Sequence, residues 1–309
     1  MKYFLGIDVG SISTNLAVID EELNVIDKLY IRTDGNPIKA IQAGLSKLKR
    51  ERISAVGTTG SARKLAGIVA GADIIKTEII AHAVAAQTFV PDVRTILEIG
   101  GQDSKIILLR KGIVVDFAMN TICAAGCGAF LDHQSNRLGI PIQDFGGIAL
   151  KSCSAATISG RCTVFAESDM IHKQQIGYRS EDIIRGLCEA IVRNYLNNVG
   201  KGKEINSPVI FQGGVAANAG VKKAFELMLG CEVAVPEHFD VMGAIGAAVL
   251  AMEDEPEKTA FKGFDISDID FQTTSFICED CPNLCEVIVI EENGEVSARW
   301  GSRCGKWNI

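Results

Sequence analysis

The sequence lacks any run of about 18 consecutive apolar residues, so we expect no membrane-spanning helix. It also lacks an excess of positive charge. Its 31 Lys and Arg residues face 38 Asp and Glu residues, and the net charge of -7 argues against a general nucleic-acid binder. Only 7 prolines accompany 31 glycines, which is typical of tight turns between regular elements. With 47% hydrophobic residues in 309, the chain is large and apolar enough for about two globular domains.

An apolar export signal is also missing, because Met1 and Lys2 lead directly into strand-like residues. We therefore expect a cytoplasmic protein. In that compartment the 10 cysteines are expected to be reduced, and some of them to bind metal rather than to form disulfides.

Two segments repeat one pattern, in which an apolar strand ends at an acidic residue and a glycine and is followed by two more strands. Asp8 and Gly10 end the first strand of one copy, and Glu98 and Gly100 end that of the other. The first strand starts at Tyr3 in one copy and at Thr95 in the other, and the strands that follow are predicted at residues 15–19 and 25–32 in the first copy and 105–109 and 113–119 in the second. The repeat predicts an α/β fold of two similar lobes with a cleft between them.

The domain limits that follow are an N-terminal lobe at 1–92, a second lobe at 93–252 and a C-terminal module at 253–309. Within the second lobe, apolar periodicity and flanking turns predict helices at residues 129–138, 180–199, 217–229 and 241–252.

The turn after each strand has residues that suit a phosphate chain. Glycine lets the backbone approach a ligand closely, neighbouring N–H groups and hydroxyls can bind phosphate oxygens, and an acid at the strand end can hold magnesium. The candidate residues are Asp8, Gly10, Ser11, Ser13 and Thr14 in the first turn and Glu98, Gly100, Gly101, Gln102 and Asp103 in the second. One such turn alone is more often a plain strand ending. Two in matching contexts favour a nucleotide site.

A third turn at Gly213 and Gly214, followed by Asn218, again joins a strand to a helix. Together the three turns resemble the two phosphate segments and the adenosine segment of the actin, hexokinase and heat-shock chaperone ATPases. That resemblance implies Mg-ATP in the interlobe cleft. The sequence departs from many relatives at Asn15, where a lysine is common, and at Glu98, where aspartate is usual.

Two of the six cysteines in the second lobe stand out: Cys123, which precedes the predicted helix at 129–138, and Cys162 in a second segment further along the chain. Small residues after Cys123 leave room for a bulky inorganic group, and the N-terminus of the following helix favours negative charge. A [4Fe-4S] cluster needs four thiolates, so a twofold dimer would complete the set. Spacing alone leaves open that both are ordinary buried cysteines.

The segments around these cysteines, Cys-Ala-Ala-Gly and Cys-Thr-Val-Phe-Ala-Glu-Ser, closely resemble the ATP-dependent activators of 2-hydroxyacyl-CoA dehydratases. Related ATPase subunits occur with benzoyl-CoA reductases and double-cubane cluster proteins. The resemblance spans about residues 1–252. It implies that Cys123 and Cys162 of two subunits hold one [4Fe-4S] cluster; Cys127, often a small hydroxyl residue in relatives, is read as a neighbour of the cluster.

The resulting hypothesis is a homodimeric ATPase that drives one-electron transfer to an iron-sulfur acceptor enzyme, with ferredoxin or flavodoxin as its reductant. Asp8 and Glu98 would organise magnesium, and Gln102 or Asp103 would position the attacking water. Phosphates would lie at Ser11, Ser13, Thr14, Gly100 and Gly101, and the nucleoside near Gly213, Gly214 and Asn218.

Four more cysteines, at positions 278, 281, 285 and 304, follow charged breaks in the C-terminal module. The set Cys278, Cys281, Cys285 and Cys304 can close around one metal, and the sequence leaves open zinc, a second [4Fe-4S] cluster, or free or crosslinked cysteines. A hairpin is predicted around Asn293 and Gly294.

Two other functions remain open at this point. One is a small-molecule kinase of the actin/hexokinase type with a structural zinc tail, for which Asp103 and Asp116 are nominal bases. The other is a nucleotide-responsive interaction protein without redox work. The sequence does not identify the acceptor enzyme.

Overall fold

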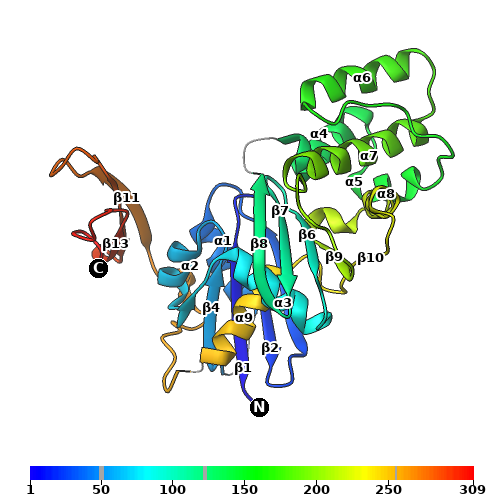
Figure 1. Ribbon diagram of the computed structural model, residues 1–309. Coiled ribbons are helices and arrows are strands. Elements are labelled where there is room, and N and C mark those ends of the chain that lie inside the picture. The colour runs from blue at the N-terminus through cyan, green and yellow to red at the C-terminus, as the bar shows by residue number, and fades with distance from the viewer. Residues whose placement is uncertain (49–51, 121–123, 255) are drawn as a thin grey trace. The chain divides into compact units, whose positions relative to one another are not determined.

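The computed structural model describes residues 1–48, 52–120, 124–254 and 256–309 of the chain. This part forms two compact units, of which unit 1 comprises Met1–Thr77 and Ala247–Ile309 and unit 2 comprises Glu78–Gly246. Each unit has its own five-stranded sheet (Figure 1). The domain limits at 1–92, 93–252 and 253–309 remain a prediction.

The sheet of unit 1 has the strand order β3-β2-β1-β4-β5. Its strands are β1 Tyr3–Val9, β2 Ser13–Asp20, β3 Val25–Arg32, β4 Ala55–Thr59 and β5 Ile74–Ile75. The first three form the expected antiparallel meander, in which Asp8 lies opposite Asn15, while β4 pairs with β1 and β5 with β4 in parallel. The carboxyl ends of β1 and β4 therefore meet at one edge.

Two helices of unit 1 are α1 Pro37–Lys47 and α2 Arg63–Ala70. The side chain of Asn36 caps α1 by accepting a hydrogen bond from Lys39 N at 3.0 Å. Helix α9, Met242–Asp254, contains the boundary between the units. Its second half packs closely on β4, because a Cβ at Gly57 would collide with the carbonyl of Ala247.

Unit 2 repeats this topology, with the strand order β10-β9-β6-β7-β8. The strands are β6 Thr95–Ile99, β7 Ser104–Arg110, β8 Ile113–Asn120, β9 Val209–Gln212 and β10 Val233–Ala234. Strands β6, β7 and β8 form the antiparallel meander, and β9 and β10 continue the sheet in parallel. The predicted duplication of a β-β-β unit is confirmed.

The helices of unit 2 are α3 Glu78–Phe89, α4 Gly128–Leu138, α5 Ile142–Ala149, α6 Thr163–Gln175, α7 Ser180–Asn198 and α8 Ala219–Leu229. Short 3-10 turns, η1 Ala124–Gly126 and η2 Gly214–Ala217, precede α4 and α8. The sequence pattern does not predict α5 and α6. Helix α5 contains Gly146 and Gly147, and α6 buries only Ala166 and Met170, so neither has a strong apolar period.

The C-terminal part consists of the turn η3 Ile266–Asp268 and an antiparallel sheet of β11 Phe271–Ile277, β12 Glu286–Glu292 and β13 Glu295–Trp300. The predicted hairpin is the β12-β13 pair, and Asn293 and Gly294 both have positive φ. Gln42 of α1 fastens this part by donating to the carbonyls of Ile266 and Ile269 at 2.8 and 2.9 Å.

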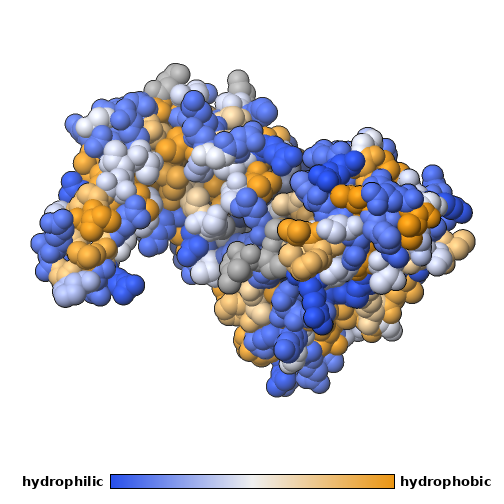
Figure 2. Space-filling model, turned by 90° about the horizontal axis from the view of Figure 1, so that it is seen from above, coloured by the Kyte–Doolittle hydropathy of each residue, from blue (hydrophilic) through white to orange (hydrophobic). Residues whose placement is uncertain are grey.

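Polar and apolar residues are intermixed on the face seen in Figure 2. In the ranges that the structure describes, no helix combines the length and the apolar character needed to cross a membrane.

Candidate functional site

The first glycine turn follows β1 in unit 1. Gly10 N donates to Ser13 O at 2.9 Å, and the Thr33 hydroxyl donates to Gly10 O at 3.0 Å. Thr14 is buried and its hydroxyl lies 3.0 Å from that of Thr33, whereas Ser11 is exposed. Of the hydroxyls predicted to meet phosphate, that of Ser11 is the most accessible in this structure.

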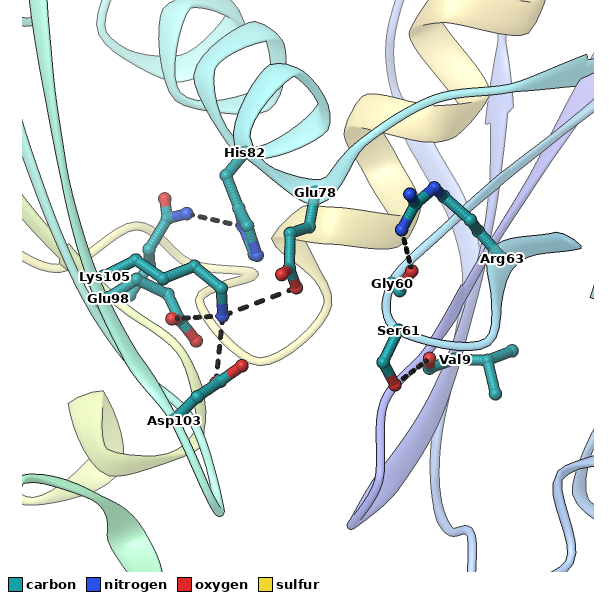
Figure 3. Close-up of polar contacts among 10 residues, drawn as sticks. Val9, Gly60, Ser61, Arg63, Glu78, His82, Glu98, Asp103 and Lys105 are labelled. Carbon is teal, nitrogen blue, oxygen red and sulfur yellow. Dashed lines mark hydrogen bonds and ion pairs between the residues drawn. The ribbon is translucent and has the colours of Figure 1, made fainter. Parts of the chain in front are cut away.

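The turn after β4 lies beside Asp8. The Ser61 hydroxyl donates to Val9 O at 3.2 Å (Figure 3), and Ala62 N donates to the same carbonyl at 3.0 Å. A Cβ at Gly60, whose φ is +92°, would stand 2.5 Å from Asp8 Oδ1. Only glycine therefore fits against the Asp8 carboxylate. The sequence motifs predicted neither Gly60 nor Ser61 as a site residue.

The second glycine turn, in unit 2, is closed by the same backbone hydrogen bond as the first. Gly100 N donates to Asp103 O at 3.0 Å, just as Gly10 N donates to Ser13 O. The repeat thus extends from the strand order to the hydrogen bonds of the turn, and this likeness supports one use for both turns.

A buried lysine that the sequence analysis did not single out lies beside the second turn. Lys105 Nζ on β7 is 3.0 Å from Glu98 Oε2, 2.9 Å from Asp103 Oδ1 and 3.4 Å from Glu78 Oε2 (Figure 3). The sheet register pairs Glu98 with Lys105, and Glu78 comes from the first turn of α3. We call these four residues the Lys105 cluster.

The pKa values in this cluster follow from burial and charge. Burial raises the pKa of Glu98 to about 8, although the Lys105 ammonium opposes that change. Burial alone would lower the pKa of Lys105, but Glu98, Asp103 and Glu78 together raise it. The lysine therefore stays charged, and Glu98 can take up a proton near neutral pH.

His82 and Gln212 form a second buried contact next to this cluster. Burial, and then the charge of Lys105, lower the pKa of His82 to about 3, so its ring is neutral at physiological pH. Gln212 Nε2 then donates to His82 Nδ1 at 2.8 Å. Gly213 follows with φ +86°, where a Cβ would lie 2.5 Å from Ile99 O and 2.8 Å from Glu98 Oε1. The third glycine turn thus packs directly on the end of β6.

Helix α4 is hydrogen-bonded to the second glycine turn. Gly128 N donates to Gly100 O and Ala129 N to Gly101 O, both at 2.8 Å. A Cβ on Gly128 would lie 3.0 Å from Gly100 O and 3.1 Å from Val215 Cγ2. The sequence led us to expect these first amides to face an inorganic group. In the structure they donate instead to the carbonyls of Gly100 and Gly101 in the second glycine turn.

The cysteine segments are described only in part. Cys123 lies outside the described residues. Cys162 is the N-cap residue of α6 and is partly exposed, and Val164 and Phe165 after it are 67% and 66% exposed. Cys127 is the buried N-cap residue of α4. Cys162 therefore stands at a surface, next to exposed apolar side chains.

An ion-pair bridge joins the helices that follow the two cysteine segments. Glu167 of α6 contacts His133 Nε2 with one carboxylate oxygen and Arg137 of α4 with the other, both at 3.0 Å. Because His133 and Arg137 lie one turn apart on α4, a single carboxylate links the first half of α6 to the second half of α4.

Asn218 caps α8, with its Oδ1 accepting from Gly220 N and Val221 N at 3.0 and 3.1 Å. A cavity of about 200 Å³ lies beside Gly220. Its lining residues are Ala149, Leu150, Ser152, Arg185, Glu189, Gly220, Lys223, Ala224 and Leu227. Its charged lining residues belong to none of the motifs that predicted the site. A larger hollow of about 650 Å³ in unit 1 is lined by none of the predicted site residues.

The four C-terminal cysteines do not converge in this structure. Cys278 is buried, and its sulfur accepts from Trp307 Nε1 and donates to Asp280 Oδ2, both at 3.2 Å. Cys281 and Cys304 are exposed. Among all described residues, no three His, Cys, Asp or Glu side chains are grouped to hold a metal ion. The four-cysteine metal site stays a prediction.

The raised pKa of Glu98 gives a testable dependence of stability on pH. Between its ordinary pKa of 4.5 and about 8, the folded chain holds a proton that the unfolded chain has lost, so stability falls as pH rises. His82 acts in the opposite direction, but only below its ordinary pKa of 6.5. From pH 6.5 to 8 we therefore expect the Glu98 contribution to the free energy of unfolding to fall, by at most about 1.4 kcal/mol per pH unit.

Denaturant unfolding across this pH range measures the slope. Glu98→Gln should flatten it, while Glu232→Gln, at an exposed position of the same unit, should leave it unchanged. Equal slopes in wild type and Glu98→Gln would contradict the expectation.

The chain is similar to ATPases over most of its length. The model of the BadF/BadG/BcrA/BcrD ATPase family matches residues 5–251, and residues 252–309 lie outside the match. The (R)-2-hydroxyglutaryl-CoA dehydratase activating ATPase of Acidaminococcus fermentans is 35% identical over 258 residues, which are 81% of this chain and 96% of that protein.

Solved structures of similar fold lead to the same family. The activator of the 2-hydroxyisocaproyl-CoA dehydratase from Clostridium difficile with bound ADPNP has a TM-score of 0.74 and 31% identity, covering 82% of this chain and 95% of that one. A ROK family glucokinase from Streptomyces griseus has a TM-score of 0.50 at 13% identity, covering 81% and 99%, and shows the shared fold alone. The predicted duplicated ATPase fold is confirmed.

Proposed function

The chain belongs to the BadF/BadG/BcrA/BcrD ATPase family, and from this premise we propose that it is a homodimeric, ATP-driven donor of low-potential electrons. One observation carries the proposal. The two hydrogen bonds from Gly128 N and Ala129 N to Gly100 O and Gly101 O connect the second phosphate turn to the helix that follows the first cysteine segment. A change at the phosphates can thereby move α4 directly.

Nucleotide binding is supported by the family and by a relative solved with ADPNP. We assign phosphate contacts to Ser11, Ser13 and Thr14 and to the backbone of Gly100 and Gly101. We assign the nucleoside to the region of Gly213, Gly214 and Asn218, and the cavity beside Gly220, whose amide Asn218 caps, is our candidate for the base.

Magnesium is assigned to Asp8 and Glu98, since carboxylate oxygens are the ligands that it prefers. Glu98 is paired with Lys105 in this structure, so the ion would compete with an ammonium group for the same oxygen. Gln102 or Asp103 would hold the attacking water, and Asp103 keeps a side chain that is 34% exposed. These roles follow the family resemblance of the turns.

The residues that would hold a [4Fe-4S] cluster are Cys123 and Cys162 from each of two copies. Cys162 fits such a group because its thiol lies at a helix N-terminus, is partly exposed and is followed by exposed Val164 and Phe165, where a second copy can approach. When bound, the cluster supplies one-electron redox chemistry. The chain itself contributes the thiols, the α4 connection and the α4-α6 bridge through Glu167.

The electron acceptor would be an iron-sulfur enzyme. The relatives named above are activators of 2-hydroxyacyl-CoA dehydratases, and we propose an acceptor of that class, of the benzoyl-CoA reductase type or of the double-cubane type. A ferredoxin or flavodoxin is the proposed reductant.

Anaerobic purification tests the proposal. We expect about four irons and four sulfides per dimer at the central site, and an electron spin resonance signal of the reduced protein that changes on addition of Mg-ATP. Mass measurement in solution should give a dimer. A colourless monomer without iron, hydrolysing ATP normally, would reject the electron-donor function and leave an ATPase of another kind.

The connection to α4 has a prediction of its own. In Gly128→Ala the added Cβ would press on Gly100 O at 3.0 Å and on Val215, so we expect the free energy of unfolding to fall by about 1–3 kcal/mol. The nucleotide-dependent change of the resonance signal should be reduced, while the iron content is kept. Gly147→Ala is the control, since nothing lies within 4 Å of its Cβ. A full nucleotide response in Gly128→Ala would contradict the coupling.

A further inference from the structure

Asn194 is a buried polar residue on α7 that no step of the proposed function uses. Its side chain is 1% exposed. Asn198 Nδ2, one turn further along the helix, donates to Asn194 Oδ1 at 2.9 Å. This bond fixes the orientation of the Asn194 amide, so that its Nδ2 group points to the segment before Cys162.

That segment is held by donors of α7. Asn194 Nδ2 donates to Gly160 O at 2.7 Å and is 3.4 Å from Arg161 O, and Arg193 donates to Ile158 O at 2.8 Å. A Cβ on Gly160 would lie 2.8 Å from the carbonyl of Ala190, so the segment runs tightly along the helix. The carbonyl next to Cys162 and the one before it both face a single amide group.

The same amide also borders the other cysteine segment. A Cβ on Gly126, the last residue of η1, would lie 2.6 Å from Asn194 Oδ1 and 2.8 Å from Asn120 Nδ2. Gly126 thus passes within van der Waals distance of the amide that holds Gly160. One buried side chain therefore lies against both segments, which are more than thirty residues apart in the sequence.

We propose that Asn194 is a positioning residue that holds the Cys162 segment and the η1 turn in register on α7, so that the Cys162 thiol is presented at a fixed place relative to η1. The reason for this positioning, the binding of a cluster, rests on the proposed function. The contacts of Asn194 with the two segments are present in the chain without metal. The hydrogen bonds donated by the Asn194 Nδ2 group provide the energy that holds the Cys162 segment in place. If Nδ2 is lost, the carbonyls of Gly160 and Arg161 are left without this partner in a buried place.

The test is alkylation of individual cysteines in chelator-treated, metal-free protein, followed by mass spectrometry of the peptides. Asn194→Asp keeps the shape of the side chain and removes the donor, so we expect Cys162 to react about tenfold faster, as for the loss of one buried hydrogen bond. Cys153 and Cys231 of the same unit should keep their rates. Asn197→Asp, which adds the same charge at an exposed position of α7, should leave Cys162 unchanged.

Gly126→Ala provides a second variant that leaves α7 intact. Its Cβ would push the amide from the other side, and we expect the same selective acceleration at Cys162. In metal-loaded protein, both variants should also shift the reduction potential, a property that loss of global stability does not tune.

The positioning role is overturned if Cys162 is alkylated at the same rate in Asn194→Asp as in Asn197→Asp. It is also overturned if the alkylation rate of Cys231 rises by the same factor as that of Cys162, because the whole unit would then have loosened. Should Asn194→Asp fail to fold, Gly126→Ala decides between the same outcomes. Absence of iron from wild type would reject the proposed function, yet it leaves the alkylation ratios as they are, so the two failures are distinguishable.

Discussion

Replacement of Lys105 by methionine is expected to lower the free energy of unfolding by about 3–5 kcal/mol, the range found when one partner of a buried ion pair is removed. The reason is that the carboxylates of Glu98, Asp103 and Glu78 would lose the cation that they share and would face an apolar side chain instead. Glu98 is buried and can be neutralised only by a proton, which its raised pKa allows near neutral pH. The loss should therefore be larger at pH 8.5 than at pH 6.5.

Denaturant unfolding at these two pH values measures the effect. Lys222→Met is the matched control, because Lys222 pairs with Glu226 at the surface of α8, where such a pair contributes about 1 kcal/mol or less. The double variant Lys105→Met/Glu98→Gln removes a cation and an anion together and should recover part of the loss. A Lys105→Met variant as stable as Lys222→Met would show that the Lys105 cluster contributes no more to the free energy of unfolding than a surface ion pair.

The single variant Lys105→Met should also weaken nucleotide binding. Removing the only cation of the Lys105 cluster raises the negative charge beside Gly100 and Gly101, where we place the phosphates. We expect a larger loss of affinity for ATP than for ADP, since ATP carries more negative charge. Equilibrium binding of the two nucleotides measures the difference, again against Lys222→Met.

Cys162→Ala is expected to remove the central iron completely and, with it, the dimer. Each copy would lose one of its two proposed thiolates, so that a shared cluster keeps only two of four ligands, too few to be held. Cys123→Ala should give the same result. Iron and sulfide analysis, absorption spectra and mass in solution after anaerobic purification measure the loss, which should be about four irons per dimer.

Three other variants serve as controls for this experiment. Cys231→Ala and Cys153→Ala change cysteines of the same unit that we do not assign to metal, and both should keep the iron and the dimer. Cys278→Ala should lose only whatever metal the C-terminal cysteines hold, iron or zinc. Unchanged cluster content in both Cys162→Ala and Cys123→Ala would reject the central site.

The local pattern of the chain was sufficient for several elements. Alternation in the strands and the glycines that end them predict both β-β-β meanders, and Asn293 and Gly294 predict the last hairpin, because these signals depend only on neighbouring residues. The family resemblance of the glycine turns and the cysteine segments pointed to an ATPase of the activator type, and the comparisons support that assignment. Helices α5 and α6 were not predicted, because few of their residues are buried and these do not recur at helical spacing.

By itself, then, the sequence determined the duplicated α/β plan and the positions of the glycine turns, since both follow from short-range periodicity and from the conformational freedom of glycine. Tertiary structure decided which charges and amides meet. Glu78, Glu98 and Asp103 converge on Lys105 only through the register of β6 with β7 and the docking of α3. Likewise, Asn194 reaches Gly160 only because α7 packs along that segment. Such contacts join residues far apart in the chain, and only the buried packing that brings them together can specify them.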